Sequence, residues 1–246
     1  MSELEQKPGA EPAVELDISA PLIAAPKEES VLRVSARTAA ILLIFTVVFT
    51  ALMAGTYTAT KPLLDASALA EKLRAIDEVL PRTAYDNDLL ADAILLPPAK
   101  ALGNDDVTHL YRARKDGKPV ALVLEAVAPD GYAGRINLIL AATPDGRLLA
   151  QRVTGHRETP GLGDYIDPKK DKNKTRPWIT QFNDKSLTEV TPAKWRVKKD
   201  GGVFDQMSGA TISARAVTNA SGRTLAWVAE RGDKLFALPT GETLGE

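Results

Sequence analysis

A polar, glycine-containing segment near the C-terminus, residues 205–217, reads Asp-Gln-Met-Ser-Gly-Ala-Thr-Ile-Ser-Ala-Arg-Ala-Val. Apolar residues then recur at steps of three and four, so the segment predicts a loop that enters a helix, with Ser213 or Thr211 as its N-cap. The first turn of such a helix has free backbone N–H groups that favour a phosphate or a carboxylate. Gly209 and Ala210 leave room for such a group. A capped helix start without a ligand is the alternative interpretation.

A second segment with chemical potential, residues 155–164, reads Gly-His-Arg-Glu-Thr-Pro-Gly-Leu-Gly-Asp. One proline and three glycines predict a loop whose backbone amides are free to meet a ligand. His156 and Glu158 are two residues apart and could act as a catalytic pair or as metal ligands, but no third ligand is in view. An ordinary surface loop is the alternative.

The first segment resembles the flavinylation motif of the FMN-binding domain shared by two protein families. These are the G subunits of Rnf electron-transport complexes and the C subunits of sodium-translocating NADH:quinone reductases. The resemblance lies in the run Asp205-x-x-Ser208-Gly209-Ala210-Thr211-x-Ser213. It implies that Thr211 forms a phosphoester with FMN, attached by a separate flavin transferase with FAD as donor. It also places Ser208, Gly209, Ala210, Ile212 and Ser213 around the cofactor.

The second segment is similar to the other signature of that family, His-x-Glu-Thr-Pro-Gly-Leu-Gly, at every named position of 156–163. The resemblance implies that this loop lies against the flavin. The implied flavin contacts are Glu158, Thr159, Gly161 and Leu162, with His156 close by. The residues at 164–166 and 178–182 resemble the Rnf subunit more than the quinone reductase subunit, and the Gly-Tyr pair at 131–132 also resembles the family.

Composition excludes several classes of protein. The 31 basic and 32 acidic side chains give a net charge of −1, which does not favour nucleic-acid binding. The absence of cysteine excludes disulfides, thiolate-bound iron–sulfur clusters and thiolate zinc sites in this chain. With two histidines only, a histidine-rich metal site is hard to build, so we expect no metal and an organic redox cofactor.

The N-terminal quarter predicts a membrane anchor. Residues 1–37 form an acidic, proline-containing segment that we expect to be a disordered tail, and residues 38–60 lack any charge and are long enough for one transmembrane helix. A buried core helix is the alternative. Arg33 and Arg37 precede the span and Lys61 follows it, so the positive-inside rule predicts a cytoplasmic tail and a periplasmic domain, 61–246, at the bacterial inner membrane.

The soluble part predicts an α+β fold. Asp65 can cap a helix in which Leu69, Leu73, Ile76 and Leu80 share a face before Pro81. Strand-like runs follow at 108–114, 120–127, 136–142 and 147–154. Asp-Gly turns at 115–118, 129–131 and 144–146 separate them and predict an antiparallel meander packed by helices.

Together these patterns predict a membrane-anchored flavoprotein subunit of an Rnf-type ion-translocating complex, which relays electrons through covalent FMN and needs no acid–base catalytic residue. Its implied partners are the other membrane, iron–sulfur and flavin subunits and the flavin transferase. The alternatives are a C-type subunit of a sodium-translocating quinone reductase, a stand-alone FMN-dependent reductase, and a non-redox regulatory module. The lysine-rich stretch 167–174 is either a solvated loop or a docking patch.

Overall fold

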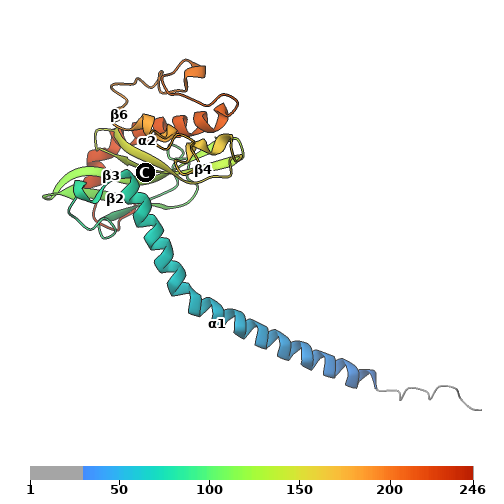
Figure 1. The fold of residues 1–246 in the computed structure, drawn as a ribbon. Helices are drawn as coiled ribbons and strands as arrows, with labels where there is room; N and C mark the ends of the chain where they lie inside the picture. The colour runs from blue at the N-terminus through green and yellow to red at the C-terminus, as the bar shows by residue number, and fades with distance from the viewer. Residues whose placement is uncertain (1–29, 246) are drawn as a thin grey trace, which may run out of the picture. The chain divides into compact units, whose positions relative to one another are not determined.

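The computed structural model describes residues 30–245, and most of the predicted tail, residues 1–29, lies outside the described residues. The chain divides between Pro62 and Leu63 into two compact units. The first described element, α1, spans Val31–Val79 and crosses this boundary (Figure 1). Residues 31–37, which the sequence predicts as the end of the tail, are therefore helical.

The apolar part of α1 has the properties expected of a membrane anchor. Among the described residues, α1 alone is long and apolar enough to cross a membrane. The hydroxyls of Thr46, Thr56 and Thr58 donate to carbonyls four residues back, at 2.8–2.9 Å. These threonines satisfy their own polar groups, as a bilayer requires.

The prediction of two helices, one at 38–60 and a second capped by Asp65, is wrong, because α1 runs through Pro62 without interruption. Proline removes one helical hydrogen bond, whereas ending one helix and starting another would free up to four carbonyls and four N–H groups. Asp65 therefore lies inside a helix and caps nothing. The helix ends at Val79, two residues before Pro81, as predicted.

The second unit begins at Leu63, and we call it the soluble unit. It is built on a six-stranded sheet in which every strand pairs antiparallel with its sequence neighbour. The predicted meander is confirmed at its four long strands, and two short strands at the edges, β1 and β6, were not predicted. The strands are β1 (Ala93–Leu96), β2 (Thr108–Lys115), β3 (Lys118–Gly131), β4 (Gly134–Ala142), β5 (Arg147–Gly155) and β6 (Lys185–Ser186).

Two of the three predicted Asp-Gly turns close hairpins. Asp116 and Gly117 connect β2 and β3 with φ values of 50° and 72°, as a type I′ turn requires. Gly146, with φ 84°, lies in the turn between β4 and β5. The predicted turn at 129–131 is wrong: these residues extend β3, and the chain reverses between Gly131 and Gly134 instead. A register shift before Gly131 accommodates a proline that has no N–H to donate.

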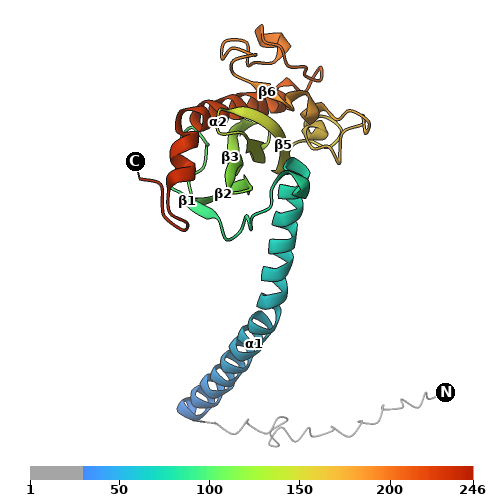
Figure 2. The ribbon, with the colours of Figure 1, turned by 90° about the vertical axis from the view of Figure 1, so that its left-hand side faces the viewer.

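The two faces of the sheet are covered by different helices, α2 (Thr211–Ala237) and the last turns of α1 (Figure 2). Leu110, Leu122 and Leu124 face α2, and their neighbours Tyr111 and Val123 face the other side, so side chains alternate along each strand. On that side Ile76 and Val79 of α1 are buried. Four short 3₁₀ helices complete the unit: η1 (Arg82–Ala84), η2 (Gly163–Ile166), η3 (Trp178–Phe182) and η4 (Lys198–Asp200).

A buried cation anchors the C-terminal end of α2 to the sheet. Arg112 is 1% exposed and donates to the carbonyls of Leu235, at 3.2 Å, and Leu238. Asp92 pairs with Arg112 and Arg114, and the hydrogen bonds from both arginines outweigh burial and lower the pKa of its carboxyl. Positive charge at a helix C-terminus is favourable because it opposes the helix dipole. Beyond the helix, residues 241–244 run alongside β1 and exchange backbone hydrogen bonds with it.

Candidate functional site

The N-terminal end of α2 is open. The helix begins at Thr211, with Ala210 in the N-cap position and no side-chain cap, so the prediction that Ser213 or Thr211 caps it is wrong. Within the described residues, the backbone N–H groups of Thr211, Ile212 and Ser213 make no hydrogen bond. Three free amides at the positive end of a 27-residue helix suit an anionic group such as a phosphate.

A tight turn leads into this helix. The Ala210 N–H donates to the Met207 carbonyl at 3.2 Å, and Gly209 at the third position has φ 84°, as a type II turn requires. A Cβ at Gly209 would meet nothing within 4 Å, so the space beside the turn is open. Glycine is needed here for its backbone conformation.

Glu158 ties three segments together at this end of the helix. The residue is 4% exposed, and its carboxylate accepts a hydrogen bond from the Ala133 N–H at 3.0 Å and another from the Ser213 hydroxyl. Ala133 lies in the β3–β4 hairpin, Glu158 in the loop after β5 and Ser213 in α2. A Cβ on Gly163 would lie 2.7 Å from a Glu158 oxygen, so glycine at that position lets the loop close over the carboxylate.

The two predicted motifs meet in the fold and line one cavity of about 230 Å³. This volume is below the 300–1,000 Å³ typical of pockets that enclose drug-sized ligands, so a flavin would be enclosed only in part. The cavity and the free amides therefore fit a phosphate with part of a larger group attached. The lining residues are Gly209, Ala210, Ile212 and Ser213 from the segment 205–217, Glu158, Thr159, Leu162 and Gly163 from the segment 155–164, and Tyr132 from the hairpin.

Four predicted site residues do not line this cavity. Gly161 turns the loop at φ 75° and donates its N–H to the Asp164 carboxylate at 2.9 Å. His156 accepts the Glu158 N–H on Nδ1 at 3.1 Å and lines a different cavity. In the chain, Ser208 directly precedes the lining residue Gly209, and Thr211 lies between two lining residues, Ala210 and Ile212.

The three hydroxyls of residues 208–213 have different surroundings. Thr211 is 9% exposed, and its hydroxyl makes no hydrogen bond within the described residues. The hydroxyl oxygen itself is not fully buried. It therefore keeps access to solvent although the residue around it is covered. The Ser213 hydroxyl is buried and engaged with Glu158, and Ser208 is exposed. Thr211 thus combines a fixed helical backbone with an available oxygen.

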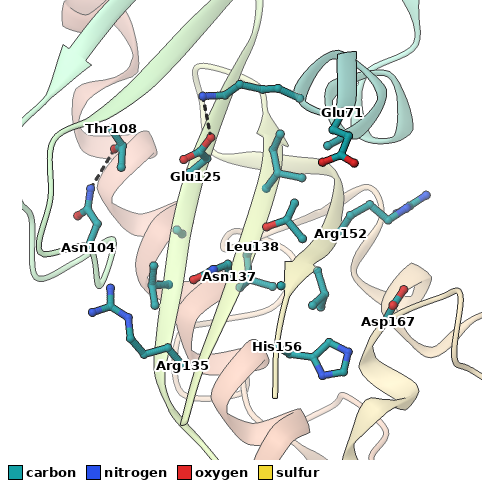
Figure 3. Close-up of a pocket in the computed structure, with 18 of the residues that line it drawn as sticks. Glu71, Asn104, Thr108, Glu125, Arg135, Asn137, Leu138, Arg152, His156 and Asp167 are labelled. Atoms are coloured by element: carbon teal, nitrogen blue, oxygen red, sulfur yellow. Dashed lines mark hydrogen bonds and ion pairs between the residues drawn. The ribbon is translucent and has the colours of Figure 1, made fainter. Parts of the chain in front are cut away.

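The larger cavity, of about 890 Å³, lies between the last turns of α1 and the sheet face opposite α2 (Figure 3). Charged side chains line it, and several are already paired: Lys72 with Glu125 at 3.1 Å, Arg135 with Asp105, and Arg152 with Glu78 at 3.6 Å. Of the predicted site residues only His156 reaches it. No group of three or more potential metal ligands occurs among residues 30–245.

Comparison with known proteins agrees with this architecture. Residues 131–226 match the FMN-binding domain family, and residues 32–79 match the RnfG N-terminal region. The matched domain covers both motif segments and the cavity between them. The fold and the site therefore define a protein with an FMN-binding domain behind an apolar N-terminal helix.

Relatives over nearly the whole chain give the family. The chain is 38% identical to the G subunit of the ion-translocating oxidoreductase complex of Pseudoalteromonas atlantica over 83% of this chain and 93% of that one. It is 42% identical to the same subunit of Photorhabdus laumondii over 83% and 94%. The chain belongs to the family of G subunits of ion-translocating oxidoreductase complexes. Among solved structures, NqrC of Shewanella oneidensis is 22% identical over 64% of this chain and 74% of that one, with a TM-score of 0.42.

Proposed function

We propose that this chain is the flavin-carrying subunit of an Rnf-type ion-translocating complex and relays electrons through an FMN joined to Thr211 by a phosphoester. The family and the matched FMN-binding domain support the class of function. The observation that carries the residue assignment is the solvent-accessible Thr211 hydroxyl at the open N-terminus of α2, next to the cavity that both motifs line.

Attachment requires a second protein and a donor. In the proposed reaction the Thr211 oxygen attacks the FMN phosphorus of FAD, a new O–P bond forms, and the pyrophosphate bond breaks with AMP as leaving group. The hydroxyl proton passes to a base of the flavin transferase. The product phosphodiester keeps one negative charge, and the free amides of residues 211–213 would stabilise it.

The residues of the cavity hold the rest of the cofactor in this proposal. Bound FMN supplies one- and two-electron chemistry, and the protein tunes it through charges and hydrogen bonds. Leu162 and Ile212, which are 51% and 43% exposed, offer apolar surface at the cavity. Glu158 adds a negative charge that disfavours electron uptake, so Glu158→Gln should leave FMN attached and raise its midpoint potential.

The proposed relay lies on the periplasmic side of the inner membrane, with the remaining membrane and redox subunits as partners. The support is the pair of arginines before the apolar segment of α1 against one lysine after it. An alkaline phosphatase fused to the C-terminus, after residue 246, should be active. An inactive phosphatase, with fluorescence from a cytoplasmic reporter at the same position, would reverse this orientation.

The attachment site is tested by Thr211→Val in cells that also produce a flavin transferase. Valine keeps the β-branched shape and removes the oxygen that forms the ester. Thr218→Val on the same helix is the matched control, because its hydroxyl donates to the Ala214 carbonyl at 2.7 Å and is buried. Wild type and Thr218→Val should fluoresce in a denaturing gel and gain the mass of FMN, and Thr211→Val should do neither. Covalent flavin in Thr211→Val at the wild-type level would refute the assignment.

A further inference from the structure

The hydroxyl of Tyr165 bridges the two ends of the turn that precedes Thr211. Tyr165 lies in η2, and its oxygen accepts the Met207 N–H at 3.0 Å and donates to the Ala210 carbonyl at 3.3 Å. The same turn is closed internally by the Ala210 N–H and the Met207 carbonyl. A side chain more than forty residues away in sequence thus holds both ends of residues 207–210.

Burial keeps the Tyr165 hydroxyl protonated and able to donate its hydrogen bond. Tyr165 is 3% exposed, and burial raises the pKa of its hydroxyl to about 12, so it keeps its proton and its role as donor throughout the physiological range. Its ring packs edge-on against Trp178, with ring centroids 5.4 Å apart. The hydroxyl can therefore be removed while the aromatic packing is kept.

A second pair of side chains fixes the start of the motif. The Trp178 indole donates to the Asp205 carbonyl at 2.6 Å. The amide side chain of Gln181 accepts the Asp205 N–H at 2.7 Å and donates to the Asp205 carbonyl at 3.3 Å. Both residues belong to η3, and Tyr165 belongs to η2. Side chains of two 3₁₀ helices therefore hold the backbone of residues 205–210 by hydrogen bonds. The carboxylate of Asp205 remains exposed and pairs with Lys198 at 2.5 Å.

The start of α2 is a place where the backbone needs such contacts to stay ordered. An α2 terminus without a side-chain cap has free N–H groups and tends to fray, and glycine at 209 adds backbone freedom. Thr211 follows the turn directly, so the direction of its hydroxyl depends on the conformation of Ala210. Without an outside contact, the oxygen and the amides that flank it would sample many arrangements.

We propose that Tyr165 is a positioning residue for flavin attachment, which presents the Thr211 hydroxyl to the flavin transferase by holding the 207–210 turn. The inference rests on the proposed function, in which Thr211 displaces AMP from FAD. Tyr165 touches neither the donor nor the reacting oxygen, and it acts through the backbone of Met207 and Ala210. Trp178 supports the same segment from Asp205.

The test compares Tyr165→Phe with Tyr85→Phe in the full-length apoprotein. Tyr85 is the matched control: it is 6% exposed, and its hydroxyl has no hydrogen-bond partner within the described residues, so its removal breaks no contact there. Purified flavin transferase and FAD are added, and FMN incorporation is followed against protein concentration. Tyr165→Phe loses both hydrogen bonds to the turn, so its kcat/KM should fall about tenfold or more, while Tyr85→Phe stays at the wild-type value.

Hydrogen exchange of the apoprotein gives a readout that needs no flavin. Amides of residues 207–213 should exchange faster in Tyr165→Phe than in wild type or Tyr85→Phe, with the amides of the central strands unchanged. Trp178→Phe, which keeps an aromatic ring and deletes the bond to Asp205, should show a smaller change in the same direction. If Tyr165→Phe fails to fold, wild-type exchange and wild-type FMN incorporation in Trp178→Phe would overturn the proposal.

The positioning role of Tyr165 and the attachment of FMN at Thr211 can fail separately. Wild-type kcat/KM and exchange in Tyr165→Phe would overturn the positioning role while Thr211 remains the attachment site. Equal losses in both tyrosine variants would also overturn it, because the effect would then be general destabilisation. Faster incorporation in Tyr165→Phe would mean that the bridge restrains the motif, the opposite of the proposal. Wild-type protein that takes up no covalent FMN would overturn both.

Discussion

The contact between Glu158 and Ser213 should be among the strongest in the domain, and a double-mutant cycle measures it. Hydrogen bonds to charged groups contribute about 1.5–3 kcal/mol, and Glu158 is buried, with 4% of the residue exposed. Ser213→Ala removes one donor from this buried carboxylate and should lower the free energy of unfolding by about 2 kcal/mol. Glu158→Ala removes the acceptor for Ser213 and for Ala133 and should cost about 3 kcal/mol.

The double variant should cost less than the sum of the two single variants, because their shared hydrogen bond is lost only once. We expect a coupling free energy of about 2 kcal/mol. Glu158→Gln gives an independent check: glutamine keeps an acceptor for the Ala133 N–H and offers an amide donor to the Ser213 oxygen. It should therefore cost only about 1 kcal/mol, through the lost charge.

Urea unfolding of the soluble unit, which begins at Leu63, provides the assay. All three tryptophans, at 178, 195 and 227, lie in this unit and report on unfolding by fluorescence. A coupling free energy below about 0.5 kcal/mol would refute the reasoning, because exposed or mobile pairs give values of that size. Close packing at Gly163 would then hold the loop after β5 to α2, and the buried Glu158 carboxylate would not contribute to that contact.

Three further predictions concern other parts of the soluble unit. Asp92→Asn leaves the Arg112 guanidinium buried without its counter-ion and should cost about 3–5 kcal/mol in the free energy of unfolding, measured in urea. The pKa of Tyr165, about 12 against the ordinary 10.0, makes a stability contribution that is complete below pH 10 and is lost as the pH rises through 12. The free energy of unfolding of wild type should therefore fall by up to about 3 kcal/mol relative to that of Tyr165→Phe over this pH range. An equal pH dependence of the two proteins would contradict the prediction. Gly222→Ala places a Cβ 2.7 Å from the indole of the buried Trp195 and should lower the melting temperature despite the better helix propensity of alanine.

Local patterns were sufficient to predict the body of the sheet. The four long strands alternate apolar and polar residues or carry continuous apolar runs, and Asp-Gly pairs at 116–117 and 145–146 occupy real turns. The Asp-Gly pair at 130–131 has the same sequence signal and lies at the end of β3, because the pairing with β4 places the reversal two residues later, at 132–133. Turn chemistry permits a reversal, and pairing between strands decides which permitted position is used.

The candidate site was predicted as two separate segments, and their meeting was implied only by family resemblance. Composition and spacing could not join them, because their contacts span large sequence separations. Ser213 was predicted as a cap because its type and position suit one, but an acceptor from the loop after β5 takes its hydroxyl. Tyr165 has no local signal for its role, since its hydrogen bonds reach Met207 and Ala210. Contacts of this kind become visible only when the fold is known.

The C-terminal residues beside β1 also protect the protein against self-association through the edge of its sheet. A sheet with an open edge strand offers unpaired N–H and C=O groups to the edge of another molecule, which is a common route to aggregation. Here Gly241 and Leu244 donate to Ala93 and Leu95, and the Leu95 N–H donates to Glu242, so the edge at β1 is occupied by the chain's own end. The opposite edge, β6, is only two residues long. A shortened chain that ends at Leu238 would expose the β1 edge and should self-associate, even though every residue of the candidate flavin site would remain.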